Sequence, residues 1–387
     1  MIRIGFPLFG HGASIGAHIY LRTTLRLIRD LLDTELRTVL LLAPHEALRF
    51  GTDISSLAHE TVTDPAFAAW GRGRDLVSCV ACGRSIGAAT ALRHARLDVA
   101  VETASFIGWA PGMRVLTWMT DFQHRLLPEM FPRKEWLRRE IGFQVQASSR
   151  KAIMLSSNTA RRDCEQYYPR TRGRIHVVRF ASGIDLSQSI PSPVELRQKY
   201  ELPDRFIYLP NQFWRHKNHT LVLDALTLLR CNGAWNDTLP IIASGPTTDP
   251  RNPDHFSSLM NRVEKSSLAE KFRHLGSIPY EDVLGMMTAC AYLINPSKVE
   301  GWSTTIEEAK TLGTKALLSD IDVHREQAPS AWFFSATDAE ACAERLLEAA
   351  KASPVTRPCM STLRSAHEAR RKAHAEALLL AVRAAVR

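Results

Sequence analysis

The sequence has few of the features that mark secreted, membrane-spanning or repetitive proteins. Its 387 residues include only seven cysteines, which are too few and too scattered for a disulfide framework. No apolar run approaches the ~18–20 residues that cross a bilayer, and the first residues lack the apolar core of a signal peptide. No short repeat is visible, which excludes solenoids and propellers. These absences favour a cytoplasmic protein with reduced cysteines.

Convincing metal ligands are also scarce. Cys79 and Cys82 form a C-x-x-C pair, but there is no second pair, and the apolar run 76–82 around them predicts a buried strand. Asp320 and Asp322 follow a predicted strand and precede a helical segment, where capping of the helix explains them without a metal. We therefore expect no bound metal and no other cofactor.

Charge of one sign is in excess. The formal net charge is +9, within an ordinary globular composition of 45% hydrophobic and 23% charged residues. Residues 133–179 hold twelve lysines and arginines against four acids. Such a segment suits nucleic acid, an anionic membrane surface or phosphorylated small molecules, and a solvated helix face explains it equally well.

Short apolar runs alternate with longer amphipathic segments along the chain, which predicts an α/β fold with two doubly wound, Rossmann-like domains facing a central cleft. The strands expected are 2–6, 37–43, 76–82, 98–102, 115–119, 152–156, 174–180, 206–210, 240–244, 272–275, 291–295, 315–319 and 331–334. Glycine, serines and prolines in 182–193 indicate the linker. The domains are then 1–184 and 185–360, followed by a helix at 361–387 that can pack back on the first domain.

Ligands of open parallel sheets bind beyond the carboxyl ends of the strands, so the loops after strands are the candidate sites. In the first domain, Gly10, Gly12 and Gly16 form G-x-G-x-x-x-G, which differs from the dinucleotide fingerprint. Gly16 would begin a helix whose N–H groups face an anion, or the loop is a tight turn without a ligand. Asp121 and His124 also follow a strand, where they can orient a sugar hydroxyl or stabilise developing positive charge, or merely cap a turn.

The first loop of the second domain is strongly basic. Arg215, His216, Lys217 and His219 lie within five residues, directly after a predicted strand. Two permanent cations and two imidazoles suit the oxygens of a pyrophosphate. A solvated basic loop is the alternative.

A second loop of this domain combines carboxylates with a helix start. Thr304 and Glu307 form an S/T-x-x-E capping box, so the backbone N–H groups of 303–305 would make an anion site. Glu300 precedes this helix and Glu308 lies one turn inside it. Both carboxylates can therefore point into the same cleft and touch different parts of a ligand.

With these motifs in place, residues 205–350 resemble the glycosyltransferases of family 4, which have the GT-B fold. The resemblance rests on P-S-x-x-E-G at 296–301, on the E-x7-E spacing of Glu300 and Glu308, and on the strand and glycine at 243–245. The first domain resembles the family more loosely. The resemblance implies a retaining transferase that uses a nucleotide-diphosphate sugar and needs no bound metal.

The resemblance also implies roles for single residues. Glu300 would contact hydroxyls of the donor sugar, Glu308 the ribose hydroxyls and Lys217 the pyrophosphate. The catalytic residues are then His124, Asp121 and Glu300, and the donor-binding residues are Lys217, Arg215, Gly301, Trp302, Ser303, Thr304, Thr305, Glu308, Gly16 and Gly245.

Two positions depart from the family pattern. The usual Gly-Arg of the first loop reads Asn211-Gln212, so Arg215 would supply the missing charge from a different position. The usual E-G-F-G reads Glu300-Gly301-Trp302-Ser303, which keeps the amides but enlarges a wall of the pocket.

The expected partners are a nucleotide-sugar donor and a saccharide or lipid-linked saccharide acceptor, in the assembly of a bacterial surface polysaccharide such as O-antigen, capsule or lipopolysaccharide. The basic segment 133–179 would hold the protein on the inner face of the cytoplasmic membrane, and no nucleic acid is expected. The alternatives are a nucleotide-sugar epimerase or hydrolase on the same fold, and a basic protein that binds nucleic acid or a membrane surface.

Overall fold

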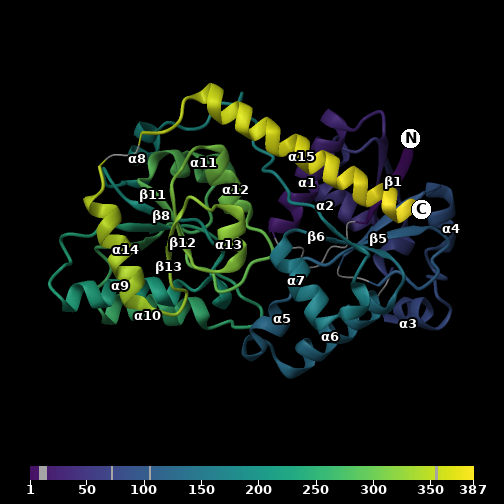
Figure 1. Cartoon of the computed structure of the whole chain (residues 1–387), viewed down its shortest axis with the longest axis horizontal. Coiled ribbons are helices and arrows are strands. Elements are labelled where there is room, and N and C mark those ends of the chain that lie inside the picture. The colour runs from purple at the N-terminus through teal and green to yellow at the C-terminus, as the bar shows by residue number, and fades with distance from the viewer. Residues whose placement is uncertain (8–14, 71–72, 104–105, 354–355) are drawn as a thin grey trace. The chain divides into compact units, whose positions relative to one another are not determined.

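The computed structural model describes residues 1–7, 15–70, 73–103, 106–353 and 356–387, which divide into two compact units. The first comprises Met1–Arg125, Arg133–Gly183 and Glu368–Arg387, and the second comprises Leu126–Pro132 and Ile184–His367. Each unit is built on one parallel β-sheet with helices between most successive strands (Figure 1).

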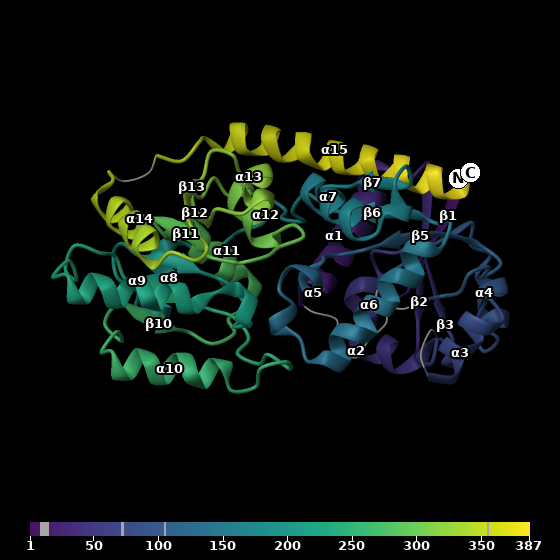
Figure 2. The same ribbon diagram turned by 60° about the horizontal axis from the view of Figure 1, so that its bottom comes forward.

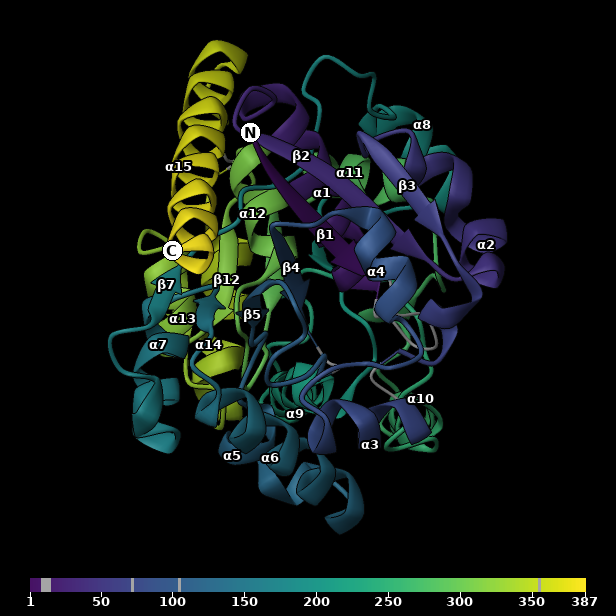
Figure 3. The same ribbon diagram turned by 90° about the vertical axis from the view of Figure 1, so that its right-hand side faces the viewer.

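The first unit has a seven-stranded sheet in the order β3-β2-β1-β4-β5-β6-β7, and all its strands are parallel. The strands are β1 (Ile2–Pro7), β2 (Leu36–Leu42), β3 (Glu60–Thr63), β4 (Val99–Glu102), β5 (Arg114–Trp118), β6 (Ala152–Leu155) and β7 (Ile175–Val177). Its helices are α1 (Ile15–Leu31), α2 (Pro44–Ser55), α3 (Gly73–Ala81), α4 (Ala89–Ala95), α5 (Gln123–Leu126), α6 (Arg133–Ser148) and α7 (Asn158–Tyr167). Figure 3 shows β1 and β2 side by side, with β3 beyond β2.

The strand predicted at 76–82 is wrong, because this segment forms the helix α3. Its apolar residues are not core residues: Val77 is 66% exposed and Val80 is 49% exposed, while Cys79 alone is buried. The third strand of the sheet is instead β3, whose sequence Glu-Thr-Val-Thr alternates between half-buried and exposed side chains. An edge strand needs no continuous apolar run, which is why the pattern missed it.

The second unit has a six-stranded parallel sheet in the order β10-β9-β8-β11-β12-β13. Its strands are β8 (Ile207–Leu209), β9 (Ile241–Ala243), β10 (Phe272–His274), β11 (Tyr292–Asn295), β12 (Ala316–Ser319) and β13 (Trp332–Phe334), and each lies within or overlaps a predicted run. Its helices are α8 (Pro193–Tyr200), α9 (His219–Cys231), α10 (His255–Lys265), α11 (Tyr280–Ala289), α12 (Thr304–Thr311), α13 (Asp322–Gln327) and α14 (Ala339–Lys351). The prediction of two doubly wound α/β domains is confirmed.

The core of the second unit lies on both faces of its sheet. On one face, α9 and α14 contribute Leu226 and Leu346, which pack in one cluster with Ile207 and Leu209 of β8. On the other face, Leu196 of α8 joins a cluster with residues of α11 and α12. From β8 the chain adds β9 and β10 on one side of the sheet, and then β11, β12 and β13 on the other side. The loops after β8 and β11 therefore leave the sheet at the topological switch point, where open α/β sheets bind ligands.

The last helix, α15 (Met360–Val386), begins in the second unit and ends in the first. In the first unit, Nη2 of Arg383 lies 2.8 Å from a carboxylate oxygen of Glu35, and Arg371 forms an ion pair with Asp30. Figure 2 shows α15 as one continuous ribbon. Within the described ranges, no helix has both the length and the apolar character needed to cross a membrane.

Candidate functional site

The site in the second unit lies in the loops that follow β8, β9 and β11. After β9, Gly245 adopts φ +144°, and a Cβ there would lie 2.5 Å from the carbonyl oxygen of Asn211 in the loop after β8. Only glycine allows these two loops to approach so closely. The Asn211 side chain in turn donates to Oδ1 of Asn295 at the end of β11 (3.2 Å). The three loops are therefore held together by backbone contact and amide hydrogen bonds.

Helix α12 begins one residue earlier than the capping box predicts. The cap is Ser303, whose Oγ accepts a hydrogen bond from the N–H of Ile306 (3.4 Å), and Thr304 is already helical. Glu307 faces the interior, where it pairs with Lys310 (2.7 Å) and accepts from Gln327 Nε2 (3.1 Å). The predicted box of Thr304 and Glu307 is thus wrong, because Ser303 caps the helix and Glu307 binds Lys310 and Gln327 through Oε1.

Gln327 also reduces the number of backbone N–H groups that the predicted anion site can offer. Its Oε1 accepts the N–H of Ser303 (3.0 Å), and its Nε2 donates to the Ser303 carbonyl oxygen (2.7 Å). The N–H groups of Thr304 and Thr305 have no acceptor among the residues that the structure describes. These two amides, at the positive end of the α12 dipole, are the ones that can receive an anion.

Glu300 and Lys217 form a half-enclosed ion pair at the switch point. Nζ of Lys217 lies 2.5 Å from Oε1 of Glu300, and the two side chains are 16% and 9% exposed. Burial alone would raise the pKa of Glu300, but the charge of Lys217 and smaller effects of His216 and His324 outweigh it and lower the pKa to about 2. Glu300 is therefore an anion at every physiological pH, and its Oε1 contacts the ammonium group of Lys217.

The pKa of Glu308 is shifted in the opposite direction from that of Glu300. Its side chain is buried, and burial raises its pKa to about 7, although the hydroxyl of Tyr280 donates to Oε1 at 2.6 Å. No cation pairs with this carboxylate within the described ranges. The two glutamates of the E-x7-E motif thus differ by several pKa units, since only Glu300 has a lysine beside it.

His324, at the start of α13, is a residue of this site that the sequence did not indicate. Its ring is fully buried, Nδ1 lies 2.9 Å from the carbonyl oxygen of Ser319, and Nε2 has no partner in the described structure. Burial lowers its pKa to about 4, so the ring is neutral near Glu300. The segment carrying it looked only like a capped helix start, and no sequence signal pointed to its electrostatic interaction with Glu300.

The two cations of the first loop reach different surroundings. Arg215 and Lys217 belong to a single 3-10 turn, which ends at Asn218 with φ +61°. Lys217 turns toward Glu300, whereas Arg215 is exposed and lines a cavity with Lys298, and neither Lys217 nor Glu300 lines that cavity. The family's Gly-Arg positions are taken here by Asn211, which is buried and bonded to Asn295, and by the half-buried Gln212.

Of the residues predicted in the first unit, Gly16 is the second residue of α1, and the rest of the glycine loop, 8–14, lies outside the described residues. Asp121 precedes α5, where Oδ1 accepts the N–H of Gln123 (3.1 Å) and pairs with Arg139. Asp121 therefore caps the turn, as the alternative interpretation had it, and is also ion-paired.

His124 is enclosed in a polar network inside the first unit. Its side chain is fully buried, and Nε2 lies 3.1 Å from both the Glu140 carboxylate and the Tyr168 hydroxyl. Burial and the nearby charge of Arg139 lower its pKa, although Glu140 opposes this effect. His124 is thus held by Glu140 of α6 and by Tyr168, the residue that follows α7.

Carboxylates and histidines do not gather into a metal site in the described ranges, where no group of three or more His, Cys, Asp or Glu residues could hold an ion. The D-x-D pair is used otherwise: Asp320 is ion-paired with Arg325, and Asp322 begins α13.

One family model covers the segment of the chain that carries this site. Residues 195–361 match the model of the family described as glycosyl transferases group 1, and this segment contains Lys217, Glu300 and Glu308. A comparison with curated proteins gives no match.

Solved structures extend the likeness over both units. Sucrose-phosphate synthase from Thermosynechococcus elongatus is 14% identical with a TM-score of 0.65, covering 97% of this chain and 94% of that chain. HepE from Anabaena, in complex with UDP and glucose, is 13% identical with a TM-score of 0.63, covering 97% and 95%. WaaG, a glycosyltransferase involved in lipopolysaccharide biosynthesis, is 16% identical with a TM-score of 0.61, covering 96% and 95%. Residues 195–361 therefore match glycosyl transferases group 1, and the chain is a glycosyltransferase with the GT-B fold of two Rossmann-like domains.

Proposed function

We propose that this glycosyltransferase is a retaining enzyme of family 4 that moves a sugar from a nucleotide-diphosphate donor to a saccharide or lipid-linked saccharide, without a bound metal. The Lys217–Glu300 pair beside the open N–H groups of α12 is the observation that carries the proposal. A fixed cation and oriented amides can stabilise the negative charge that develops on a leaving diphosphate.

Each side chain then has a separate task. Lys217 and the amides of Thr304 and Thr305 bind the diphosphate, while the ionised Glu300 accepts hydrogen bonds from hydroxyls of the transferred sugar. Glu308 accepts from the ribose hydroxyls of the nucleotide, with Tyr280 holding its other oxygen. Because Lys217 forms an ion pair with Glu300, its ammonium group has to contact both that carboxylate and the diphosphate when the donor binds.

Thermal unfolding with UDP, GDP, ADP and dTDP, each in EDTA, tests the donor site. A nucleotide at about 100 times its dissociation constant should add about 2.7 kcal/mol of stability. We expect a shift with one nucleotide in the natural protein and none in Glu308→Ala. The absence of a shift with all four nucleotides would refute a nucleotide donor.

Kinetic tests address Lys217 directly. Lys217→Ala should lower turnover by ~100-fold or more, the scale on which one preorganised charge-stabilising group acts. Lys265→Ala, which removes an exposed lysine at the end of α10, is the matched control and should leave turnover unchanged. Near-normal turnover in Lys217→Ala would remove this lysine from the mechanism.

The acceptor and setting are proposed from surface chemistry and from one similar structure. WaaG has this fold and is described as acting in lipopolysaccharide biosynthesis, which supports the assembly of a bacterial surface polysaccharide on the inner face of the cytoplasmic membrane. On α6, the exposed apolar residues Leu137 (53%) and Ile141 (54%) lie one turn apart, among Arg133, Lys134 and Arg138. A helix face that mixes apolar and cationic groups suits an anionic bilayer surface.

Vesicle pelleting tests this surface. The protein should sediment with vesicles containing anionic lipid and not with neutral ones, and Leu137→Asp should weaken the binding. Asn261→Asp, an exposed position on α10, makes a comparable change of charge elsewhere and should not affect sedimentation. Equal binding to neutral vesicles would rule out recognition by charge.

A further inference from the structure

The second unit contains a cavity of about 340 Å³ that the donor site leaves unused. Its lining comes from the 3-10 turn Arg215–Lys217 and the residue after it, the first two turns of α9, the start of α10, the loops after β11 and β13, and Met130 at the end of the short 3-10 helix Pro128–Met130. None of Lys217, Glu300, Glu308 or Gly245 lines it. The volume falls at the lower end of the ~300–1,000 Å³ typical of small-ligand pockets.

Two cations face this cavity without an acidic partner. The side chains of Arg215 and Lys298 both line it, and neither forms an ion pair within the described ranges. The one carboxylate of the lining, Asp224, is already paired with Arg262 on α10. With Asp224 paired to Arg262, the positive charges of Arg215 and Lys298 have no counter-ion in the lining, a repulsive arrangement that a bound anion would relieve.

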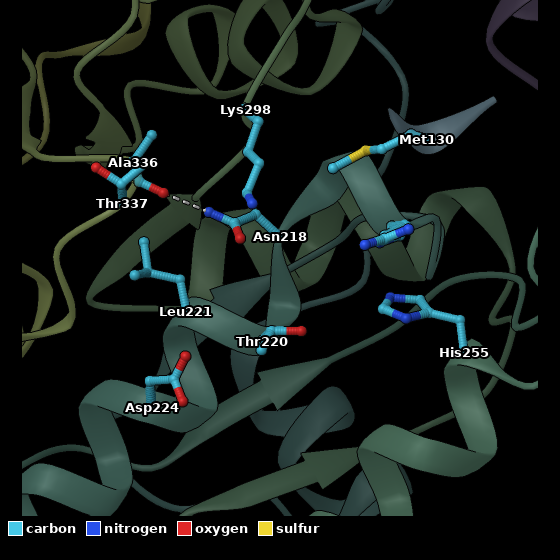
Figure 4. Close-up of a pocket in the computed structure, with 10 residues that line it drawn as sticks. Met130, Asn218, Thr220, Leu221, Asp224, His255, Lys298, Ala336 and Thr337 are labelled. Atoms are coloured by element: carbon cyan, nitrogen blue, oxygen red, sulfur yellow. Dashed lines mark hydrogen bonds between the residues drawn. The ribbon is translucent and has the colours of Figure 1, made fainter. Parts of the chain in front are cut away.

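Hydrogen-bonding groups also line the cavity. Asn218 is 5% exposed, and its Nδ2 donates to the carbonyl oxygens of Pro296 (3.0 Å) and Ala336 (2.9 Å). Both amide hydrogens are thereby used, so Oδ1 is left as an acceptor that has no donor in the described structure. Figure 4 shows the amide of Asn218 below the amino group of Lys298, with Thr220 and Asp224 on the α9 side.

The composition of the lining narrows the class of ligand. It has no aromatic ring except the imidazole of His255, so a nucleobase would find no phenyl or indole surface to stack on. Apolar contact is limited to Met130, Leu221 and Ala336. Two cations together with hydroxyl, amide and carboxylate oxygens in one lining suit a molecule with one phosphate and several hydroxyl groups.

We propose that this cavity is a second ligand site, which binds a small phosphate monoester of a polyhydroxy compound. Arg215 and Lys298 hold the phosphate, and Asn218, Thr220 and Asp224 bind the hydroxyl groups. The proposal does not depend on the donor site, since the two share no residue that contacts both ligands. A phosphorylated sugar and free inorganic phosphate have the same anionic group, and the hydroxyl contacts distinguish them.

Titration calorimetry at fixed ionic strength tests the site with three probes: glucose 6-phosphate, inorganic phosphate and glucose. We expect glucose 6-phosphate to bind at least tenfold more tightly than phosphate, and glucose not to bind. Lys298→Ala should weaken glucose 6-phosphate tenfold or more, whereas Lys265→Ala should not change it. Glu308→Ala should bind the probe normally, because Glu308 does not line the cavity.

Several results would overturn the proposal. No binding of glucose 6-phosphate, or equal affinity in the natural protein and Lys298→Ala, removes the phosphate contact. Equal affinity for glucose 6-phosphate and phosphate removes the hydroxyl contacts. Loss of binding in Glu308→Ala places the probe in the donor site instead. Thr220→Ala, at an exposed position, serves as a second variant if Lys298→Ala unfolds, and it should weaken glucose 6-phosphate without affecting phosphate.

Discussion

Replacing Glu308 by glutamine should stabilise the protein at pH 8 and leave its stability unchanged at pH 4.5. Burial raises the pKa of Glu308 to about 7 from an ordinary value of 4.5. The folded state therefore binds this proton more tightly than the unfolded state, and the free energy of unfolding falls as the pH rises from about 4.5 to about 7. Each pKa unit corresponds to 1.36 kcal/mol, so ionisation of Glu308 costs the folded state about 3 kcal/mol above pH 7.

Glutamine removes this cost and keeps the hydrogen bond, because its amide oxygen can still accept from Tyr280. The melting temperature of the second unit should rise by about 2–4 °C per kcal/mol, and only at the higher pH. Glu264→Gln, at an exposed position on α10, is the control and should change the melting temperature equally little at both pH values. Equal melting temperatures of Glu308→Gln and the natural protein at pH 8 would refute the account of a buried, unpaired carboxylate.

Three further measurements follow from other parts of the structure. Lys217 holds the pKa of Glu300 at about 2, so the stability of this pair is complete above pH 4.5 and is lost as the pH falls toward 2; Glu300→Gln should flatten that part of an acid titration. Gly245→Ala should destabilise the folded protein by about 1–3 kcal/mol, because φ is +144° and the new Cβ meets a carbonyl oxygen. Gly142→Ala, in open space within α6, is the control and should stabilise the folded protein by about 0.5–1 kcal/mol in the same thermal assay. Nearby hydroxyls lower the pKa of the exposed thiol of Cys359 to about 7, so iodoacetamide at pH 7 should alkylate it before the other exposed cysteines, and mass spectrometry of peptides would contradict this if they react together.

Most of the fold was predictable because buried parallel strands consist of short apolar runs in the sequence. All four residues of β11 are buried, as are all three of β8 and of β9, and such strands can be recognised from composition alone. The failures have the converse cause. Strand β3 is polar and half-exposed, and helix α3 carries apolar residues on its exposed side. An apolar run therefore predicts a buried strand only where its side chains are in fact buried, and a polar edge strand gives no such run.

The site was predictable where its geometry is local. Glu300 and Glu308 are joined by one loop and one helical turn, so their spacing already places both at the carboxyl end of β11. The contacts that set their electrostatic states come from distant segments: Lys217 is 83 residues from Glu300, and Tyr280 is 28 residues from Glu308. Gln327, which takes the N–H of Ser303, is likewise invisible in the local pattern.

Arg215 and Lys217 show how backbone geometry separates residues that a motif groups together. The sequence assigns both cations to one pyrophosphate, because they are two positions apart in a basic loop. In a 3-10 helix, with three residues per turn, side chains two positions apart leave the axis about 120° from each other. Lys217 accordingly meets Glu300, and Arg215 meets the cavity that Lys298 also lines. Under both proposals, this one turn therefore supplies a cation to each of two anionic ligands. The direction of each side chain is set by the backbone of the turn, so replacing one cation by the other would not change which ligand each position meets.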